Sequence, residues 1–315
     1  MKLLLKNQVT IITKIRLFGK LSYNACAMQK RIDFYTHALD QLNASEVYFG
    51  HGTECAEDEV WWLMASVLRL PIEGDFEVLM DAPLTEAEWH NLEQVLMQRI
   101  QKRIPLAYLL HEAYQNGYQF YVDERVLIPR SPIAELIQNQ FQPWIREEAV
   151  TQILDLCTGS GCLAILAAYA FPEAQVVGSD LSADALEVAA KNVALHQMQR
   201  QVSLAQSNVF GSLGQGRYDI IVSNPPYVDA PDFESMPKEY QHEPSMALEA
   251  GADGLEIVRQ ILKEAKSHLT PGGILVVEVG NSASALEAAF PDLPFIWLDF
   301  ERGGDGVFLL READL

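Results

Sequence analysis

Short apolar segments alternate with segments of helical length from Thr151 to the end of the chain. The apolar segments are rich in branched side chains and predict strands at residues 152–156, 174–179, 201–206, 218–223, 274–279, 295–300 and 306–310. Helices are predicted between them at residues 161–170, 183–196, 254–269 and 283–290. Alternation of this kind folds into a doubly wound, mostly parallel sheet. We therefore expect an α/β fold with a seven-stranded sheet.

The end of the chain departs from the parallel pattern. Only residues 301–305 separate the last two predicted strands. A crossover between parallel strands needs a dozen or more residues. These two strands must therefore pair in antiparallel fashion.

A helical domain is predicted ahead of the sheet, at residues 31–112. Its apolar side chains recur at helical intervals, and aromatic residues are frequent among them. Thr85 and Glu88 have the spacing of a capping box, in which each side chain binds the backbone amide of the other residue. This spacing predicts that a helix begins at about residue 86.

Between the helical domain and the sheet, residues 113–145 predict a hairpin linker. The period of the sequence changes here, and residues 118–122 and 125–128 predict two strands joined by a turn at residues 123–124. The α/β domain then comprises residues 146–315.

The chain is strongly acidic, with 43 Asp and Glu residues against 23 Lys and Arg residues and a net charge of −20. An acidic surface repels phosphate backbones and attracts basic partners, so we expect no nucleic-acid substrate. The first 31 residues are the exception, because they hold seven basic residues and no acidic one, which leaves −27 for the remainder. We expect residues 1–30 to be a basic extension outside the folded unit, with Met28 as the natural initiator.

Membrane and metal chemistry have little support in the composition. No apolar run approaches the ~18–20 residues that a membrane-spanning helix needs. The four cysteines form no C-x-x-C pair and have no histidine-rich ligand spacing; they are Cys26, Cys55, Cys157 and Cys162. We expect reduced cysteines in a cytoplasmic protein, without a metal site.

The sequence Asn224-Pro225-Pro226-Tyr227 follows a predicted buried strand. Two prolines cannot continue a sheet ladder, so the strand ends there. Its carboxyl end then lies at the edge where open α/β sheets bind ligands. Asn224 offers an amide oxygen that can accept hydrogen bonds from a planar NH₂ group, beside an aromatic ring. An ordinary strand-ending turn is the alternative, since Asn and Pro are common turn residues.

A glycine-containing turn joins the first predicted strand of the sheet to its helix. Gly159 and Gly161 allow a ligand to approach the backbone closely, and Asp180 at the end of the next strand can accept hydrogen bonds from both hydroxyls of a ribose. The same spacing fits the dinucleotide fingerprint, so a hydride-transfer enzyme is a competing interpretation.

Asp155, four residues before Gly159, favours a different cofactor. A carboxylate at this place would repel a pyrophosphate group but would hold the ammonium group of an amino-acid ligand. Hydride transfer also has no use for the Asn-Pro-Pro-Tyr sequence. S-adenosylmethionine carries a ribose, an ammonium group and no phosphate, and is the cofactor that we expect.

With both motifs in hand, the chain resembles class I S-adenosylmethionine-dependent methyltransferases, and more narrowly the peptide glutamine N(5)-methyltransferases. The resemblance runs from about residue 31 to the end and rests on residues 154–162, 224–227 and 278–280. One branch of that family methylates release factors, and another methylates the third protein of the large ribosomal subunit. The segments that resemble the ribosomal-protein branch are residues 48–53, residues 129–137, Cys157 in place of a glycine, and residues 240–244.

The resemblance implies roles for particular residues. It implies that the helical domain recognises the substrate, a basic ribosomal protein. The implied cofactor-binding residues are Asp155, Cys157, Thr158, Gly159, Ser160, Gly161, Asp180, Asn208, Val209 and Asn224. The implied catalytic residues are Asn224, Pro225, Pro226 and Tyr227, and these four also bind the substrate together with Arg130. Arg130 lies between two prolines, and a solvated linker charge is the alternative for it.

Asn208 departs from the family, which typically has an aspartate that contacts the adenine amino group. Asparagine keeps a carbonyl acceptor but loses the charge, so we expect weaker recognition of adenine. Val209 would flank the adenine as an apolar wall.

The catalytic roles that the resemblance implies rest on positioning. The Asn224 side-chain carbonyl and the Pro225 backbone carbonyl would each accept one N–H of the substrate amide, while Pro226 and Tyr227 pack against its plane. A release-factor methyltransferase and a nucleic-acid adenine or cytosine N-methyltransferase are the nearest alternatives. The acidic body disfavours the latter, which would need a basic groove. A non-catalytic protein that binds S-adenosylmethionine would not need the intact Asn-Pro-Pro-Tyr sequence.

Overall fold

The computed structural model describes residues 29–71 and 75–315, so that most of the predicted basic extension, Met28 included, lies outside the described residues. The chain forms two compact units, one up to Leu110 and one from His111 to Leu315. None of the helices in this described part is long and apolar enough to cross a membrane.

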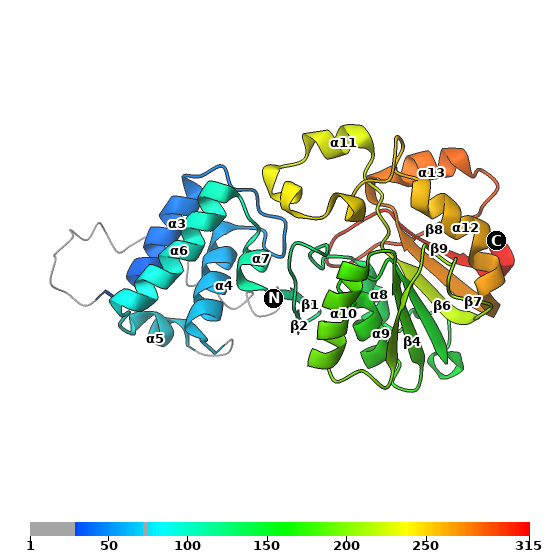
Figure 1. Cartoon of the computed structure of the whole chain (residues 1–315), viewed down its shortest axis with the longest axis horizontal. Helices are drawn as coiled ribbons and strands as arrows, with labels where there is room; N and C mark the ends of the chain where they lie inside the picture. Colours follow the sequence, from blue (N-terminus) through cyan, green and yellow to red (C-terminus); the bar gives the residue numbers. More distant parts are fainter. Residues whose placement is uncertain (1–28, 72–74) are drawn as a thin grey trace. The chain divides into compact units, whose positions relative to one another are not determined.

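The first unit is helical, as predicted. Its helices are α3 (Arg31–Asn43), α4 (Ala56–Leu68), α5 (Phe76–Asp81), α6 (Glu86–Lys102) and α7 (Leu106–Leu110) (Figure 1). The capping box at the start of α6 is confirmed: the Glu88 amide donates to Thr85 Oγ1 at 3.2 Å, and the Thr85 amide donates to Glu88 Oε2 at 2.8 Å. The short helices α5 and α7 were not expected individually.

A buried ion pair supports the loop between α3 and α4. Arg99 of α6 pairs with Glu59 of α4, and both side chains are almost fully buried. Arg99 also donates to the Tyr48 carbonyl at 2.7 Å, and Glu59 accepts a hydrogen bond from the Thr53 hydroxyl at 3.0 Å. The segment 48–53, one of those that resemble the ribosomal-protein branch, is therefore bound at both of its ends.

The second unit begins with a hairpin, but the predicted position of its turn is wrong. Strands β1 (Ala113–Gln115) and β2 (Tyr118–Phe120) pair antiparallel. Asn116 and Gly117 form the turn, with φ of 50° and 84°. Tight two-residue hairpins require positive φ at both central positions, which Asn-Gly adopts readily. The aromatic and branched residues on either side of residues 123–124 suggested strands there, but that segment is not part of a hairpin.

The sheet has the predicted seven strands, in the order β5-β4-β3-β6-β7-β9-β8 (Figure 1). The strands are β3 (Gln152–Leu156), β4 (Gln175–Asp180), β5 (Val202–Gln206), β6 (Tyr218–Ser223), β7 (Leu269–Glu278), β8 (Ile296–Trp297) and β9 (Val307–Arg311). The first five in sequence run parallel to one another, whereas β9 pairs antiparallel with both β7 and β8. The predicted antiparallel end of the sheet is thus confirmed.

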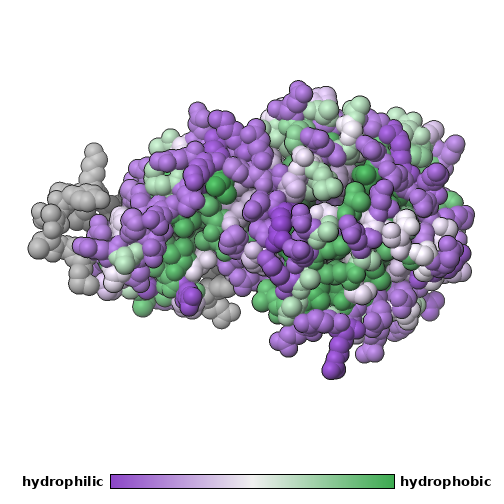
Figure 2. Space-filling model, viewed as in Figure 1, coloured by the Kyte–Doolittle hydropathy of each residue, from purple (hydrophilic) through white to green (hydrophobic). Residues whose placement is uncertain are grey.

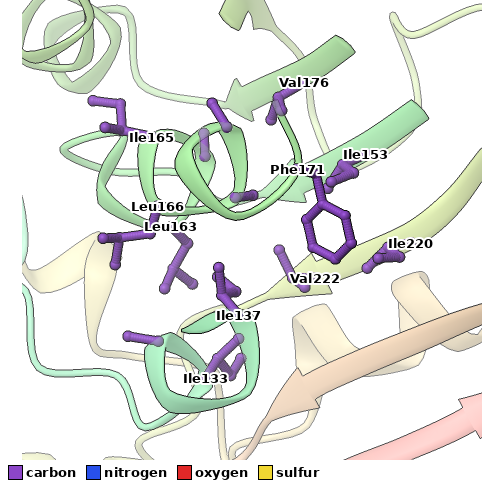
Figure 3. Packing of buried hydrophobic residues seen from close by; sticks show 14 of the residues in the cluster. Ile133, Ile137, Ile153, Leu163, Ile165, Leu166, Phe171, Val176, Ile220 and Val222 are labelled. Carbon is purple, nitrogen blue, oxygen red and sulfur yellow. The ribbon is translucent and has the colours of Figure 1, made fainter. Parts of the chain in front are cut away.

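Helices cover both faces of the sheet. They are α8 (Ile133–Gln138), α9 (Cys162–Ala170), α10 (Ala183–Leu195), α12 (Glu256–His268) and α13 (Ala283–Ala289). Helix α11 (Ala230–Ser235) lies in the connection after β6 and has no buried residue. Successive strand residues point to opposite faces, so Ile153 packs against α8 and α9 while Leu154 packs in the cluster that contains α12 (Figure 3). Both faces are buried, which explains why the parallel strands are apolar without alternation.

Five short 3₁₀ turns complete the described part of the chain. They are η1 (Glu147–Ala149), η2 (Lys238–His242), η3 (Ser245–Ala247), η4 (Gly280–Ser282) and η5 (Glu312–Asp314). Two of them, η2 and η3, lie in the long connection between β6 and α12 that follows the Asn-Pro-Pro-Tyr sequence.

Gly306→Ala should destabilise the protein by roughly 3 kcal/mol or more, as overpacking a tight contact commonly does. Gly306 has φ of 66°, and a Cβ atom there would lie 2.2 Å from the carbonyl oxygen of Gly280. Gly303→Ala is the matched control, because Gly303 has φ of 83° but a Cβ atom would meet nothing within 4 Å. The control should lose only about 1 kcal/mol of stability, which is the cost of the backbone strain. Urea unfolding measures both, and equal losses would contradict the contact.

Candidate active site

A cavity lies at the carboxyl ends of β3, β4, β5 and β6, where the turns that follow these strands meet. It encloses about 1100 Å³ with its open mouth included. The other walls come from residues 125–131 and from residues 244–247. The position of the cavity agrees with the rule that open α/β sheets bind ligands beyond the carboxyl ends of their strands.

The turn after β3 is held between two carboxylates. Asp155 accepts hydrogen bonds from the Thr158 hydroxyl at 2.5 Å and from the Ala164 amide at 3.0 Å. Asp180, at the end of β4, accepts one from the Gly159 amide at 2.9 Å. Hydrogen bonds to the protein itself therefore hold the turn, and Thr158 and Gly159 line the cavity together with Cys157 and Ser160.

Asp155 does not line the cavity. It is 1% exposed, and its Oδ1 atom has no hydrogen-bond partner in the described part of the chain. Burial raises the pKa of this carboxyl to about 7. A buried carboxylate oxygen without a donor is costly, so this atom fits a ligand that brings a cation or a donor. Gly161 likewise lies behind the cavity wall, with a Cβ position only 3.2 Å from Ala189.

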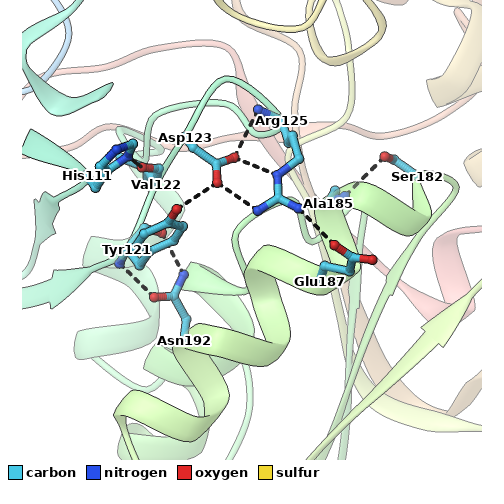
Figure 4. Close-up of polar contacts among 9 residues, drawn as sticks. All are labelled: His111, Tyr121, Val122, Asp123, Arg125, Ser182, Ala185, Glu187 and Asn192. Atoms are coloured by element: carbon cyan, nitrogen blue, oxygen red, sulfur yellow. Dashed lines mark hydrogen bonds and ion pairs between the residues drawn. The ribbon is translucent and has the colours of Figure 1, made fainter. Parts of the chain in front are cut away.

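Asn192 of α10 connects the turn after β3 to the linker, and this role was not predicted from the sequence. Its side chain is fully buried and donates to the Ser160 carbonyl at 2.8 Å and to the Tyr121 carbonyl at 2.9 Å. Its Oδ1 atom accepts a hydrogen bond from the Tyr121 amide at 2.7 Å (Figure 4). Only an amide side chain supplies both donors and the acceptor here. A buried Asn within an otherwise apolar helical stripe was the signal that could have revealed it.

Ionic contacts hold the next part of the linker on α10. Arg125 donates to both carboxylate oxygens of Asp123, at 2.9 and 2.7 Å, and to Glu187 at 2.9 Å (Figure 4). The hydrogen bonds from Arg125 lower the pKa of Asp123 to about 2. Arg125 itself lines the cavity. The predicted turn at residues 123–124 thus leads directly into the wall segment, which begins at Arg125.

Asn208 and Val209 both line the cavity, as expected of an adenine subsite. Val209 has φ of 48°, an unfavourable backbone conformation for a branched residue. The Ser207 hydroxyl donates to the Val209 carbonyl at 2.8 Å and helps to hold it. Cys157 has φ of 57°, a backbone conformation that favours glycine. Strained backbone of this kind concentrates at functional sites.

The Asn-Pro-Pro-Tyr turn contributes two of its four residues to the cavity. Asn224 and Pro226 line it, whereas Pro225 is buried and Tyr227 is not among the lining residues. The Tyr227 hydroxyl instead donates to Glu278 at 2.9 Å. Its ring therefore lies behind the turn, and the expectation that Tyr227 forms a wall against the substrate has no support in this geometry.

Arg130 lines the cavity and is not a solvated linker charge. Its guanidinium group binds both oxygens of Glu243, at 2.6 and 2.8 Å, and Glu243 is buried. Glu243 also accepts a hydrogen bond from the Ile128 amide at 3.0 Å. Bidentate pairs of this kind are strong and geometrically specific. Arg130 thus joins the wall segment 125–131 to the connection that follows the Asn-Pro-Pro-Tyr turn.

Metal chemistry has no site in this region. Among residues 29–71 and 75–315, no three His, Cys, Asp or Glu side chains are arranged to hold a metal ion. The polar groups of the cavity, the Asp180 carboxylate, amide side chains and backbone amides, match a cofactor that has hydroxyls and an amino group, and the buried Asp155 beneath them suits an ammonium group.

Comparison with known proteins first identifies the class of protein to which the chain belongs. Residues 137–238 match the family model of the methyltransferase small domain. The turn after β3, Asp180 and the seven-stranded sheet with its antiparallel end agree with this match. The protein is an S-adenosylmethionine-dependent methyltransferase with a doubly wound fold.

Curated relatives then define the family. A ribosomal protein uL3 glutamine methyltransferase from Bordetella pertussis is 45% identical over 93% of this chain and 98% of its own length. One from Neisseria meningitidis serogroup B is 48% identical over 90% of this chain and 93% of its own length. The chain belongs to the ribosomal protein uL3 glutamine methyltransferase family, which confirms the predicted resemblance. A solved structure of the hMettl16 catalytic domain in complex with an RNA hairpin has 15% identity and a TM-score of 0.49 over 72% of this chain and 81% of its own, too weak a likeness to bear on function.

Asp155→Asn should stabilise the ligand-free enzyme at pH 8 and weaken its binding of S-adenosylmethionine. The folded-state pKa of about 7 lies above the ordinary value, so the stability that Asp155 contributes is present at low pH and lost as the pH rises through 7. Asparagine does not ionise, and we expect a gain of roughly 1–2 kcal/mol at pH 8 and little change at pH 4. Thermal unfolding at the two pH values and calorimetric titration with the cofactor measure these effects.

Asp219→Asn is the matched control with the opposite sign. Asp219 accepts hydrogen bonds from Thr151, Gln152 and Thr270, and these bonds lower its pKa. The Asp219→Asn substitution should destabilise the protein at pH 8 and leave cofactor affinity unchanged. A destabilised Asp155→Asn variant would contradict the assignment of a costly buried charge.

Asn192→Ala should weaken cofactor binding about fivefold, because the turn loses the donor that holds the Ser160 carbonyl and one net hydrogen bond contributes about 1 kcal/mol. Gln201→Ala is the control: its side chain also donates to two carbonyls, those of Ala168 and Phe171, but it lies outside the cavity lining. The control should lose stability and keep its affinity. Titration calorimetry distinguishes the two, and equal affinities would contradict the coupling.

Proposed function

We propose that this enzyme transfers a methyl group from S-adenosylmethionine to the side-chain amide nitrogen of a glutamine in ribosomal protein uL3. The observation that carries the proposal is the position of Asn224. Its side chain lines the same cavity as the cofactor turn after β3. The names of the curated relatives supply the substrate.

The cavity residues fit the cofactor in a definite orientation. Asp180, which lines the cavity, would accept hydrogen bonds from the ribose hydroxyls, and Asp155, which is buried beneath the lining residues, would attract the ammonium group through its charge. Asn208 accepts a hydrogen bond from the adenine amino group, and Val209 packs against the ring. The bound cofactor supplies an electrophilic methyl group on a sulfonium ion.

Asn224 and Pro225 orient the substrate amide. The nitrogen is a weak nucleophile, because its lone pair is delocalised into the carbonyl group. The side-chain carbonyl of Asn224 and the backbone carbonyl of Pro225 each accept one N–H, which directs the lone pair towards the methyl group. Pro226 packs against the amide plane. Orientation of reacting groups can lower a barrier by up to ~7–11 kcal/mol, so no base needs to act first. The alkylated nitrogen is acidic and loses its proton to solvent.

The surface charge suits a basic protein substrate. Hydrophilic residues cover much of the face that Figure 2 shows, and the chain carries a net charge of −20. Ribosomal proteins are basic, and opposite charges accelerate their association with this surface. Solubility alone would also account for an acidic surface. We further propose that the helical domain, residues 31–112, recognises the substrate, and that the reaction takes place in the cytoplasm.

Labelled S-adenosylmethionine offered to purified uL3, release factor and ribosomal RNA side by side tests the substrate. We expect label in uL3, recovered after hydrolysis as methylated glutamine. Label in release factor alone would keep the chemistry and overturn the substrate, and label in RNA alone would overturn both.

Asn224→Ala should lower the turnover number by at least about a hundredfold, the cost of removing one oriented hydrogen-bonding group from such a site. The dissociation constant of S-adenosylmethionine should change much less. Ser223→Ala is the neighbouring control: its hydroxyl donates to the Leu156 carbonyl at 2.9 Å, outside the cavity lining. Steady-state kinetics and calorimetry measure both variants. Turnover of Asn224→Ala close to that of the wild type would refute the assignment.

A further inference from the structure

Glu278, the last residue of β7, is a buried carboxylate that the proposed function does not use. The residue is 6% exposed. Its Oε1 atom accepts a hydrogen bond from the Tyr227 hydroxyl at 2.9 Å, and its Oε2 atom accepts one from the Ser131 hydroxyl at 2.5 Å. One side chain thus connects two segments that are 96 residues apart in the chain, as the positions of Ser131 and Tyr227 show.

Both of these segments form walls of the cavity. Ser131 itself lines the cavity, next to Arg130. Tyr227 directly follows the residues of the other wall, Asn224 and Pro226. A displacement of Tyr227 therefore moves the group that is proposed to hold the substrate amide.

Tyr227 is also enclosed by its surroundings. Its ring lies so close to Gly280 that a Cβ atom there would be 2.6 Å from Cε2. The Ser282 hydroxyl donates to the Tyr227 carbonyl at 2.9 Å. The side chain and the backbone of Tyr227 thus both contact residues that follow β7 and do not line the cavity.

An unpaired carboxylate at this place would be unfavourable. Burial raises the pKa of Glu278, whereas its hydrogen bonds with Ser131 and Tyr227 and the charge of Arg130 act against that rise, and Asp305 adds to it. Burial and the negative charge of Glu278 raise the pKa of the Tyr227 phenol well above its ordinary value, so the phenol stays a donor. An apolar side chain could fill the same space without the cost of burying a charge, but it would not orient two hydroxyl groups.

We propose that Glu278 is a positioning residue that sets the place of Asn224 in the active site through its hydrogen bond to Tyr227, and that it aligns the facing wall through Ser131. Tyr227 then anchors the turn, and its ring is not a surface for the substrate. This proposal rests on the proposed function of Asn224.

The test compares Glu278→Ala, Tyr227→Phe and the variant that carries both changes, with uL3 as the substrate. Each single change should lower the turnover number about tenfold, which corresponds to one hydrogen bond to a charged group. The double variant should be no slower than Glu278→Ala, because both changes remove the same bond. The dissociation constant of S-adenosylmethionine should stay within about twofold. Glu278→Gln should recover most of the turnover, since an amide oxygen still accepts the phenol hydrogen.

Thr270→Val is the matched control at the other end of β7. The Thr270 hydroxyl donates to a carboxylate oxygen of Asp219 at 2.8 Å, outside the cavity lining, and its loss should leave turnover unchanged. Thermal unfolding shows which variants are folded. If Glu278→Ala does not fold, Ser131→Ala and Tyr227→Phe carry the test, and each should lower turnover with unchanged cofactor affinity.

Three results would overturn the proposal. The first is a turnover number of the double variant that falls by the product of the two single losses. The second is wild-type turnover in Glu278→Ala, or in both Ser131→Ala and Tyr227→Phe, and the third is a cofactor affinity that falls as much as turnover. Wild-type enzyme that leaves uL3 unlabelled would instead overturn the proposed function. The variants are then compared on whichever substrate of the side-by-side assay the wild type labels, so the two failures are distinguishable.

Discussion

Carboxylates, three of them buried, hold the loops of the active site in place, and the rest of the site depends on them. The walls of the cavity are turns and connections that have few backbone partners of their own. Asp155 and Asp180 bind the turn after β3, Glu243 binds the segment that contains Arg130, and Glu278 joins that segment to the Asn-Pro-Pro-Tyr turn. Each carboxylate is costly to bury and is retained where it accepts several hydrogen bonds. Loops that would otherwise exchange between conformations are thereby kept in one.

The sheet could be predicted closely from the sequence because its central strands are buried on both faces. The predicted bounds of β3 and β6 coincide with those observed, and the antiparallel end followed from the length of residues 301–305. The hairpin was misplaced for the opposite reason. Aromatic and branched residues around positions 123–124 resemble strands by composition alone, whereas the deciding signal was the local one, the Asn-Gly pair at positions 116–117.

Some residues of the site could likewise be predicted from the sequence, and others could not. Residues on the turns that follow parallel strands could be predicted, since the topology brings all such turns to one edge; Cys157, Asp180, Asn208 and Asn224 do line one cavity. Residues that hold these turns from behind are harder to predict. For Asn192 the one signal is a polar side chain in the apolar stripe of α10, and its partners, backbone carbonyls that any sequence supplies, leave no pattern in the chain.

This division matters for the chemistry, because an amide nitrogen reacts only when its lone pair is directed at the methyl group. The groups that touch the substrate are few and are common turn residues, so they cannot by themselves enforce that direction. The accuracy comes from what lies behind them: a strand end closed by two prolines, a tyrosine bound to a buried carboxylate, and a cofactor turn bound to a buried amide. In the proposed mechanism no strong base acts before transfer, so the orientation of the substrate amide depends on these buried polar contacts. Its sensitivity to substitution should extend as far into the interior as those contacts do.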